Sequence, residues 1–131
     1  MKLKMLFDSK YYEDKGYMLT IPPQILLLTD VLAHFDRITN DPSIQKPFFE
    51  IVDFSNTKEI DFGYEDAKKL MGKIVELKRH DKYQGSLLIA NTDYIRGMTN
   101  IYRVVGESAK INIVQVTSLD RALDIVNERI A

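Results

Sequence analysis

The stretch Phe48-Phe49-Glu50-Ile51-Val52-Asp53-Phe54 decides the fold class of this chain. Its β-branched and aromatic residues are typical of a buried strand. Segments with the pattern of a strand and then of a helix follow it along the chain. Because strands that alternate with helices indicate a largely parallel sheet covered by helices, we interpret this stretch as the central strand of an α/β domain.

Two strands and one helix are expected before the central strand. We predict the first strand at Lys2 to Phe7 and the second at Tyr17 to Ile21, able to pair as a hairpin. A polar connection from Asp8 to Gly16, with turn-forming residues at its end, joins them. The helix ends before Asn40 and has apolar residues at helical spacing, namely Leu28, Val31, Leu32, Phe35 and Ile38.

Three helices and two strands are expected after the central strand. A loop over residues 55–63 leads into a helix with an apolar stripe made of Ala67, Leu70, Met71, Ile74 and Leu77. The strand Ser86 to Ala90 is followed by a loop over residues 91–96, and the next helix should begin near Gly97. The last strand covers Ile111 to Val116, and Ser118 is the expected N-cap of a terminal helix.

The resulting order, β-β-α-β-α-β-α-β-α, predicts one domain over residues 1–131. Its sheet should be mostly parallel but mixed, with an N-terminal hairpin and about four helices packed on it. A length of 131 residues and a hydrophobic content of 45% suit a single core.

Composition disfavours several classes of partner and site. Lys plus Arg number 18 and Asp plus Glu number 19, so the net charge of -1 favours neither nucleic acid nor an anionic membrane. The absence of Cys excludes disulfides, thiolate nucleophiles and Cys-based metal sites. No apolar run approaches the roughly 20 residues that cross a bilayer, and no signal peptide is recognised. We therefore expect a cytoplasmic protein without membrane insertion.

The two histidines, His34 and His80, have no second His or carboxylate at the spacing of metal ligands. Neither is close in sequence to a Ser that could act as a nucleophile. We therefore expect no metal and no cofactor, and we place both imidazoles on the surface or in half-buried positions.

The chain resembles the STAS superfamily, the sulphate-transporter and anti-sigma-factor-antagonist domains. The resemblance rests on the strand Phe49 to Phe54 with its Asp53, the turn Asp61-Phe62-Gly63-Tyr64 and the segment Val116 to Leu123. It covers about residues 17 to 130 and is greatest to small single-domain bacterial members of the SpoIIAA-like group. It implies a STAS-like fold and a regulatory domain that binds other proteins and has no catalytic activity.

The same resemblance draws attention to the start of the second helix. In classical antagonists a partner kinase phosphorylates a Ser in an Asp-Ser-Ser-Gly-like turn there. The matching stretch of this chain, Asp61-Phe62-Gly63-Tyr64, has no Ser. A phosphate there would also stand near Glu65 and Asp66, which would repel it. The resemblance therefore implies a member without the usual phosphorylation switch.

Candidate site residues follow from the expected sheet. In open α/β sheets ligands bind beyond the carboxyl ends of the strands, which here are the loops after Asp53, Ala90 and Val116. There Arg96 and the helix N-terminus near Gly97 could hold a small polar or anionic ligand, together with Ser118. The alternative is that these polar residues only form loops and caps. The candidate interaction or ligand residues are Asp53, Asn56, Asp61, Gly63, Tyr64, Asn91, Thr92, Asp93, Arg96 and Gly97.

Two catalytic alternatives involve single carboxylates. Asp53 at the end of a buried strand resembles the phosphoacceptor of receiver domains, but these also need an acidic pair after the first strand and a Lys after the last. The chain offers only Asp8 early and Val116-Thr117-Ser118 late, so we expect Asp53 to accept backbone N–H groups of its loop instead. An enzyme with Asp53 or Asp93 as a base is a further alternative.

The main alternative to protein binding is a small-ligand or lipid-binding module of the same fold. A carrier of that kind needs a concave apolar cavity between the helices and the sheet, whereas an interaction module needs none. A homodimer could form through the edge of the first hairpin or through a helix face. The sequence favours a protein partner and leaves a homodimer and a small ligand open.

Overall fold

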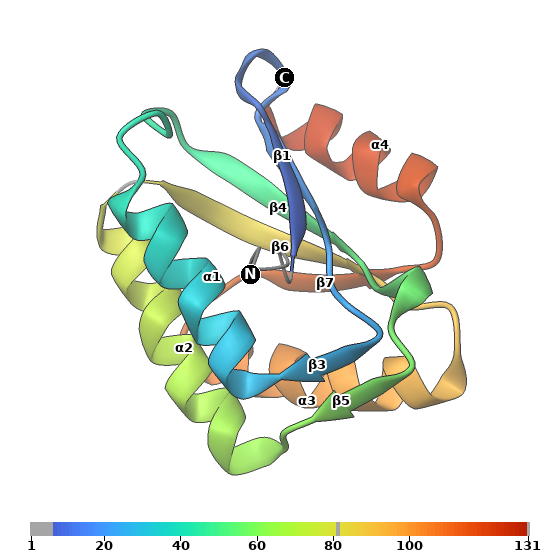
Figure 1. Ribbon diagram of the computed structural model, residues 1–131. Coiled ribbons are helices and arrows are strands. Elements are labelled where there is room, and N and C mark those ends of the chain that lie inside the picture. Colours follow the sequence, from blue (N-terminus) through green and yellow to red (C-terminus); the bar gives the residue numbers. More distant parts are fainter. Residues whose placement is uncertain (1–6, 81, 131) are drawn as a thin grey trace, which may run out of the picture.

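A five-stranded mixed sheet forms the centre of the computed structural model, which describes residues 7–80 and 82–130 (Figure 1). In spatial order its strands are β1 (Asp8–Tyr12), β2 (Tyr17–Ile21), β4 (Phe48–Asp53), β6 (Tyr83–Ile89) and β7 (Ile113–Val116). β1 is antiparallel to β2, and the other neighbouring strands are parallel. The predicted α/β class, with a mixed and mostly parallel sheet, is therefore confirmed.

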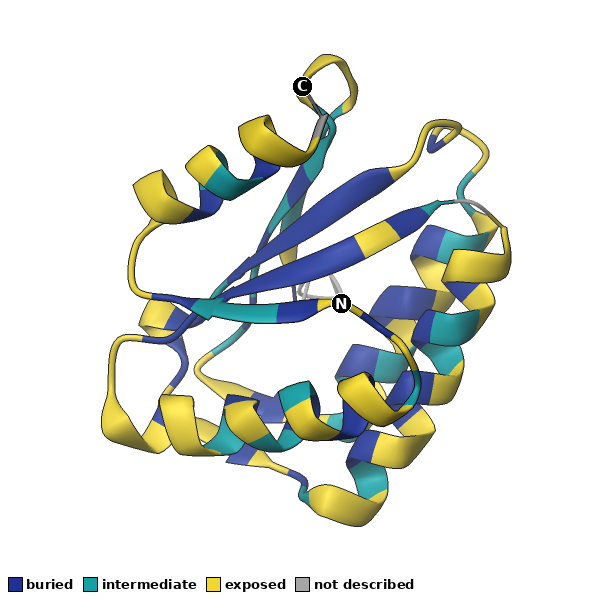
Figure 2. Cartoon of the chain, turned by 180° about the vertical axis from the view of Figure 1, so that it is seen from behind, coloured by how far each residue is buried: buried dark blue, intermediate teal, exposed yellow. Residues whose placement is uncertain are grey.

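Four helices in the described residues cover the two faces of this sheet. They are α1 (Leu28–Asn40), α2 (Tyr64–Arg79), α3 (Asp93–Ser108) and α4 (Leu119–Ile130). α1, α2 and α3 pack on one face and α4 on the other. Figure 2 shows buried residues on the sides of the helices that face the sheet and exposed residues on their outer sides.

The central strand β4 contributes side chains to both hydrophobic cores, one on each face of the sheet. Phe48 and Val52 pack with α1, α2 and α3, whereas Phe49 and Ile51 pack with α4. Successive side chains of a strand point to opposite faces, so a strand covered on both sides needs an almost continuous apolar run. Glu50, which interrupts that run, faces the same side as Phe48 and Val52.

A second, two-stranded parallel sheet lies beside the main one. It pairs β3 (Ile25–Leu27) with β5 (Glu59–Asp61), and the short helix η2 (Phe54–Asn56) comes before β5. The Thr57 hydroxyl, which donates to the Pro23 carbonyl at 3.0 Å, holds the two segments together. The sequence analysis missed both strands, because three residues are too few to show an alternating pattern.

The N-terminal hairpin is present, but its first strand lies in the predicted connection. The expected strand at residues 2–7 falls outside the described residues except for Phe7. β1 instead begins at Asp8, and the short helix η1 (Glu13–Lys15) and Gly16, with a φ of 74°, turn the chain into β2. An edge strand accepts polar residues, and Tyr11 and Tyr12 of β1 have high strand propensity.

The third helix begins at Asp93 rather than near Gly97, so the predicted loop over residues 91–96 is mostly helical. The Thr92 hydroxyl accepts a hydrogen bond from the Ile95 N–H at 3.2 Å and caps the helix. Such a cap stabilises a helix by about 1 kcal/mol, which offsets the similar penalty of Gly97 inside it. Ser118 accepts from the Arg121 N–H at 3.1 Å, as its predicted capping role requires.

Within residues 7–80 and 82–130, every helix is too short or too polar to cross a membrane.

Candidate functional site

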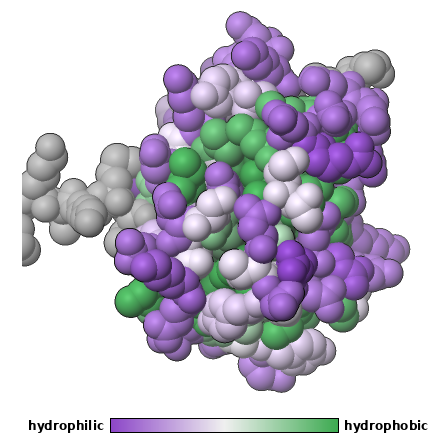
Figure 3. Space-filling model, turned by 90° about the vertical axis from the view of Figure 1, so that its right-hand side faces the viewer, coloured by the Kyte–Doolittle hydropathy of each residue, from purple (hydrophilic) through white to green (hydrophobic). Residues whose placement is uncertain are grey.

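The carboxyl ends of β4 and β6 form a rim on the side of the molecule shown in Figure 3, where apolar surface appears between hydrophilic side chains. Asp53 pairs in register with Ile89, so the segments that follow the two strands are neighbours. This arrangement brings together seven of the predicted residues, namely Asp53, Asn56, Asn91, Thr92, Asp93, Arg96 and Gly97. The other three, Asp61, Gly63 and Tyr64, lie between the end of β5 and the start of α2.

Polar side chains on this rim bond mainly within their own turns. Asp53 accepts from the Ser55 N–H at 3.0 Å and from the Ser55 hydroxyl, which is the backbone role that the sequence analysis expected. Asp93 forms an ion pair with Arg96 one turn later in α3. These contacts match the interpretation of the rim residues as caps and turns.

An exposed apolar surface lies next to the rim, on the outer face of the small sheet. Ile25 and Leu27 of β3 are 55% and 40% exposed, whereas Leu26 between them is buried. Their partners in register on β5 are the exposed residues Glu59 and Asp61. We call these four residues, together with Tyr94, the β3–β5 patch.

Tyr94 links this patch to the rim. Its ring is 46% exposed, and its hydroxyl accepts a hydrogen bond from the Ile60 N–H at 3.0 Å. The first turn of α3 is thereby tied to β5. Tyr64 at the start of α2 is also exposed, with the Lys68 ammonium 4.9 Å from its ring centroid.

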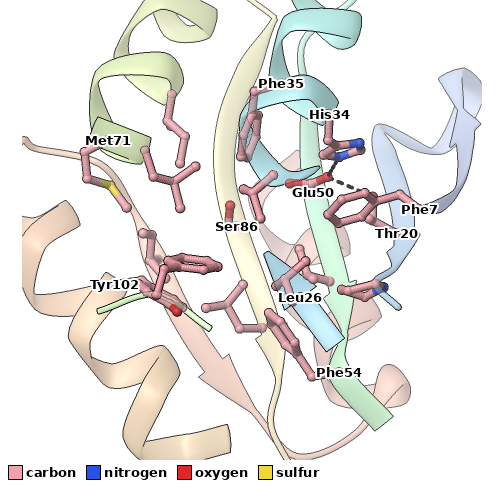
Figure 4. Close-up of a pocket in the computed structure, with 18 residues that line it drawn as sticks. Phe7, Thr20, Leu26, His34, Phe35, Glu50, Phe54, Met71, Ser86 and Tyr102 are labelled. Carbon is pink, nitrogen blue, oxygen red and sulfur yellow. Dashed lines mark hydrogen bonds and ion pairs between the residues drawn. The ribbon is translucent and has the colours of Figure 1, made fainter. Parts of the chain in front are cut away.

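In contrast to the exposed rim and patch, a buried polar cluster lies beneath the helices α1, α2 and α3. Glu50 of β4 is only 1% exposed. Its Oε2 atom accepts a hydrogen bond from the Thr20 hydroxyl of β2 at 2.8 Å and lies 2.7 Å from His34 Nε2 of α1 (Figure 4). Three elements far apart in the sequence therefore meet at one carboxylate oxygen.

The hydrogen bonds of His34 define its tautomer. Arg37 Nη2 lies 3.3 Å from His34 Nδ1, and a guanidinium can only donate, so Nδ1 accepts. The proton is then on Nε2, which donates to Glu50. His34 is 3% exposed and stacks on the Phe7 ring with 4.5 Å between centroids. The expectation of a surface or half-buried His34 was wrong, because the core presents a carboxylate partner to it.

Ser86 of β6 extends this cluster across a third strand. It pairs in register with Glu50, and its hydroxyl is hydrogen-bonded to the Tyr83 hydroxyl. Burial raises the pKa of Tyr83, and the nearby Glu50 charge adds to the rise, while the Ser86 hydrogen bond opposes it. Thr20, Glu50 and Ser86 thus form a polar row across β2, β4 and β6.

A cavity of about 60 Å³ lies between this polar row and the three helices (Figure 4). Apolar residues form most of its lining. Tyr102 of α3 stands on the opposite side from Glu50, and its hydroxyl has no hydrogen-bond partner among the described residues. Burial is the main cause that raises the pKa of Tyr102, with Tyr94 and Asp66 contributing. The Tyr102 phenol therefore stays protonated at neutral pH and can donate a hydrogen bond.

The sequence analysis missed every polar residue of this cavity, namely Thr20, His34, Glu50, Ser86 and Tyr102. One signal was present in the sequence. Glu50 is a charged residue in the middle of an apolar strand, and a buried carboxyl group requires hydrogen-bond partners. The partners themselves come from other elements and have no local pattern.

In the part of the chain that the structure describes, no three His, Asp or Glu side chains cluster as metal ligands would. No family model matches the chain, and neither a curated protein nor a solved structure matches it.

Proposed function

We propose that this protein is a non-enzymatic, STAS-like regulatory domain that binds another protein. The order of its elements and its mixed, mostly parallel sheet are consistent with the fold that the resemblance implies. The proposed interaction surface is the β3–β5 patch with the adjoining starts of α2 and α3. This surface includes the loop segments expected to bind a partner and adds β3, which the sequence did not predict.

The exposed β3–β5 patch is the observation that carries this proposal. Ile25 and Leu27 present apolar side chains to solvent on a regular strand, although their neighbour Leu26 is buried normally. Exposed apolar residues that are contiguous and rimmed by polar groups are typical of interaction sites. Because Glu59 and Asp61 stand beside them, the partner should offer apolar side chains flanked by Lys or Arg.

The proposal does not include a phosphorylation switch at the start of α2. The turn Asp61-Phe62-Gly63-Tyr64 has no Ser, and Glu65 in the first turn of the helix is exposed and negative. A phosphate there would be repelled by the same carboxylates that we expect to attract a basic partner. Binding should therefore depend on the charge of the patch itself.

The absence of catalysis in the proposal is supported by the state of the rim carboxylates. A general base needs a carboxylate that can reach a substrate proton. Asp53 is hydrogen-bonded to Ser55, and Asp93 is paired with Arg96. Asp53 holds the backbone of its own turn, and Asp93 is paired with a side chain of its own helix.

Quantitative affinity purification from the source cells tests the proposal. We compare the wild-type chain with Leu27→Ser, which removes apolar contact, and Glu59→Lys, which reverses charge. Glu128→Lys on α4, an exposed charge reversal on the other side of the sheet, is the matched control. The proposal expects the same protein to be lost with both patch variants and retained with the control.

Calorimetry with the purified partner completes this test. Glu59→Lys should weaken binding by at least about tenfold and make it less sensitive to salt, because one favourable charge pair is replaced by repulsion. Equal affinity of the wild type and both patch variants would exclude this surface. If the captured protein were a second copy of this chain, the proposed heterologous partner would be wrong and the patch would be a homodimer interface.

A further inference from the structure

We propose that the cavity beneath α1, α2 and α3 is a binding site for a small alcohol, a molecule with a short apolar body and one hydroxyl group. The site differs from the exposed β3–β5 patch, although the buried Leu26 of β3 belongs to its lining. It is the small-ligand alternative of the sequence analysis, with the ligand class now defined by the residues of the cavity.

Glu50 provides the recognition group. Both hydrogen bonds that it makes with described residues end on Oε2. In Figure 4 the other carboxylate oxygen, Oε1, points away from His34 and Thr20, toward the space between Ser86 and the helices. No donor among the described residues bonds Oε1, so a ligand hydroxyl in the cavity can add a hydrogen bond there.

The two donors on Oε2 leave Oε1 as the carboxylate oxygen that faces the cavity. Thr20 donates its hydroxyl proton to Oε2, and the tautomer fixed by Arg37 makes His34 a donor as well. Oε1 is therefore an acceptor, and a ligand hydroxyl at this position must act as the donor.

The walls of the cavity define the rest of the ligand. They are formed largely by apolar side chains, among them Leu26, Val52, Phe54, Phe62, Leu70 and Leu88. Water in a cavity needs two to four polar partners for each molecule, and these walls offer few. An apolar body in contact with the walls and a single hydroxyl on Glu50 satisfy the cavity better than a cluster of waters.

The volume limits the size of the ligand. A cavity of about 60 Å³ holds roughly two to four water molecules, which is the size of an alcohol with two or three carbons. The acyl chain of a lipid is far larger. The lipid alternative therefore does not fit this cavity, and a short alcohol does.

A surface hollow shares the residue His34 with the cavity. The hollow has a volume of about 170 Å³ and is lined by Ser9, Arg37 and Asp41 among others. His34 lines both spaces, so the hollow lies beside the cavity.

Two isomers test the inference with the full chain. 1-Propanol and ethyl methyl ether have the same atoms, but only the alcohol can donate a hydrogen bond. Each is titrated into methyl-labelled protein, and binding is read from NMR shifts of Leu70, Ile74 and Leu88, whose side chains line the cavity. The Tyr102 hydroxyl can donate to either isomer, so the bond to Glu50 is what distinguishes them, and for the wild type we expect the alcohol to bind at least about tenfold more tightly than the ether.

The variant Glu50→Gln should reverse this preference. Thr20 and His34 both donate, so they hold the amide oxygen in the place of Oε2 and leave the amide N–H₂ in the place of Oε1. The hydroxyl proton of the alcohol then has no acceptor at this position, whereas the ether oxygen can accept from the amide, so the ether is favoured. Asp53→Asn, the same chemical change on the same strand but at the rim, is the control and should keep the preference for the alcohol.

The comparison of isomers on the wild type needs no variant, so the inference remains testable even if Glu50→Gln does not fold. Equal binding of the two isomers, or an unchanged preference in a folded Glu50→Gln chain, would show that Glu50 does not select the ligand. If neither isomer shifts the cavity methyl signals, the cavity holds only water or remains empty and the proposal is wrong.

Discussion

The rim and the interior cavity use the same residue types in opposite ways. On the rim, Asp53 and Asp93 bond to residues two and three positions away in the chain. In the cavity, Glu50 bonds to residues from two other elements, 30 and 16 positions away. A carboxylate at the rim shapes its own turn, whereas the buried carboxylate connects a strand, its neighbour and a helix. The position of a polar group in the fold, and not its chemistry alone, decides what its removal does.

The comparison is tested most strongly by removing one partner from a buried pair and one partner from an exposed pair. His34→Leu leaves Glu50 buried with only Thr20 as a donor, so we expect the free energy of unfolding to fall by about 3 kcal/mol. Asp93→Ala breaks an exposed pair and should leave the stability unchanged within error. Denaturant unfolding of the two variants measures both effects.

A double variant checks the cause. His34→Leu combined with Glu50→Leu removes the unpaired carboxylate and should recover part of the stability lost by His34→Leu alone. A double variant less stable than His34→Leu would mean that packing of the imidazole, and not its hydrogen bond to Glu50, accounts for the loss.

The two sides of α3 provide a second, smaller test. Gly106 faces the core, where an added Cβ would lie 2.7 Å from Ile113 Cδ1, whereas Gly97 has nothing within 4 Å. Gly106→Leu should therefore destabilise the protein by about 2 kcal/mol through overpacking. Gly97→Leu should be neutral or slightly stabilising, because leucine has a higher helix propensity than glycine.

Thermal unfolding of both variants measures this difference. Since Gly97 is also a predicted interaction residue, Gly97→Leu can be compared with the wild type in partner binding. Equal destabilisation by the two substitutions would mean that α3 does not present Gly97 to solvent.

The smallest expected effect concerns the rim itself. Thr92→Ala removes the cap of α3 and should lower the free energy of unfolding by about 1 kcal/mol. Thr117→Ala is the matched control, because Thr117 is exposed and makes no side-chain hydrogen bond with the described residues. Circular dichroism during denaturation reports both. A Thr92→Ala chain as stable as the control would contradict the capping role and reopen Thr92 as a ligand residue.

Patterns that belong to one element were predictable from the sequence. The apolar spacing of α1 and α2 places both helices, and the run around Ile51 places the central strand. These elements bury whole faces, so their periodicity is long enough to recognise. Helix α3 was predicted with a wrong start because Thr92 was not recognised as its N-cap.

Features that depend on pairing between distant segments were not predictable. β3 and β5 are each three residues long and are defined only by one another. The cavity is assembled from side chains on five strands, the short helix η2 and the helices α1, α2 and α3, and its His34–Glu50 contact has no sequence signature. The rim residues were identified because a general rule for parallel sheets points to the carboxyl ends of strands. No similar rule points to a polar row inside a core.

The small size of the β3–β5 sheet has a consequence for motion. It is held to the rest of the molecule by the hydrogen bond to Tyr94 of α3 and by the buried side chains of Leu26 and Ile60, and not by continuation of the main sheet. Segments of this kind open locally at a lower free energy than the core, so their amides exchange hydrogen faster than those of β4. The proposed interaction surface can therefore adapt to a partner, and because Leu26 of β3 also lines the cavity, opening of the small sheet would change the cavity as well.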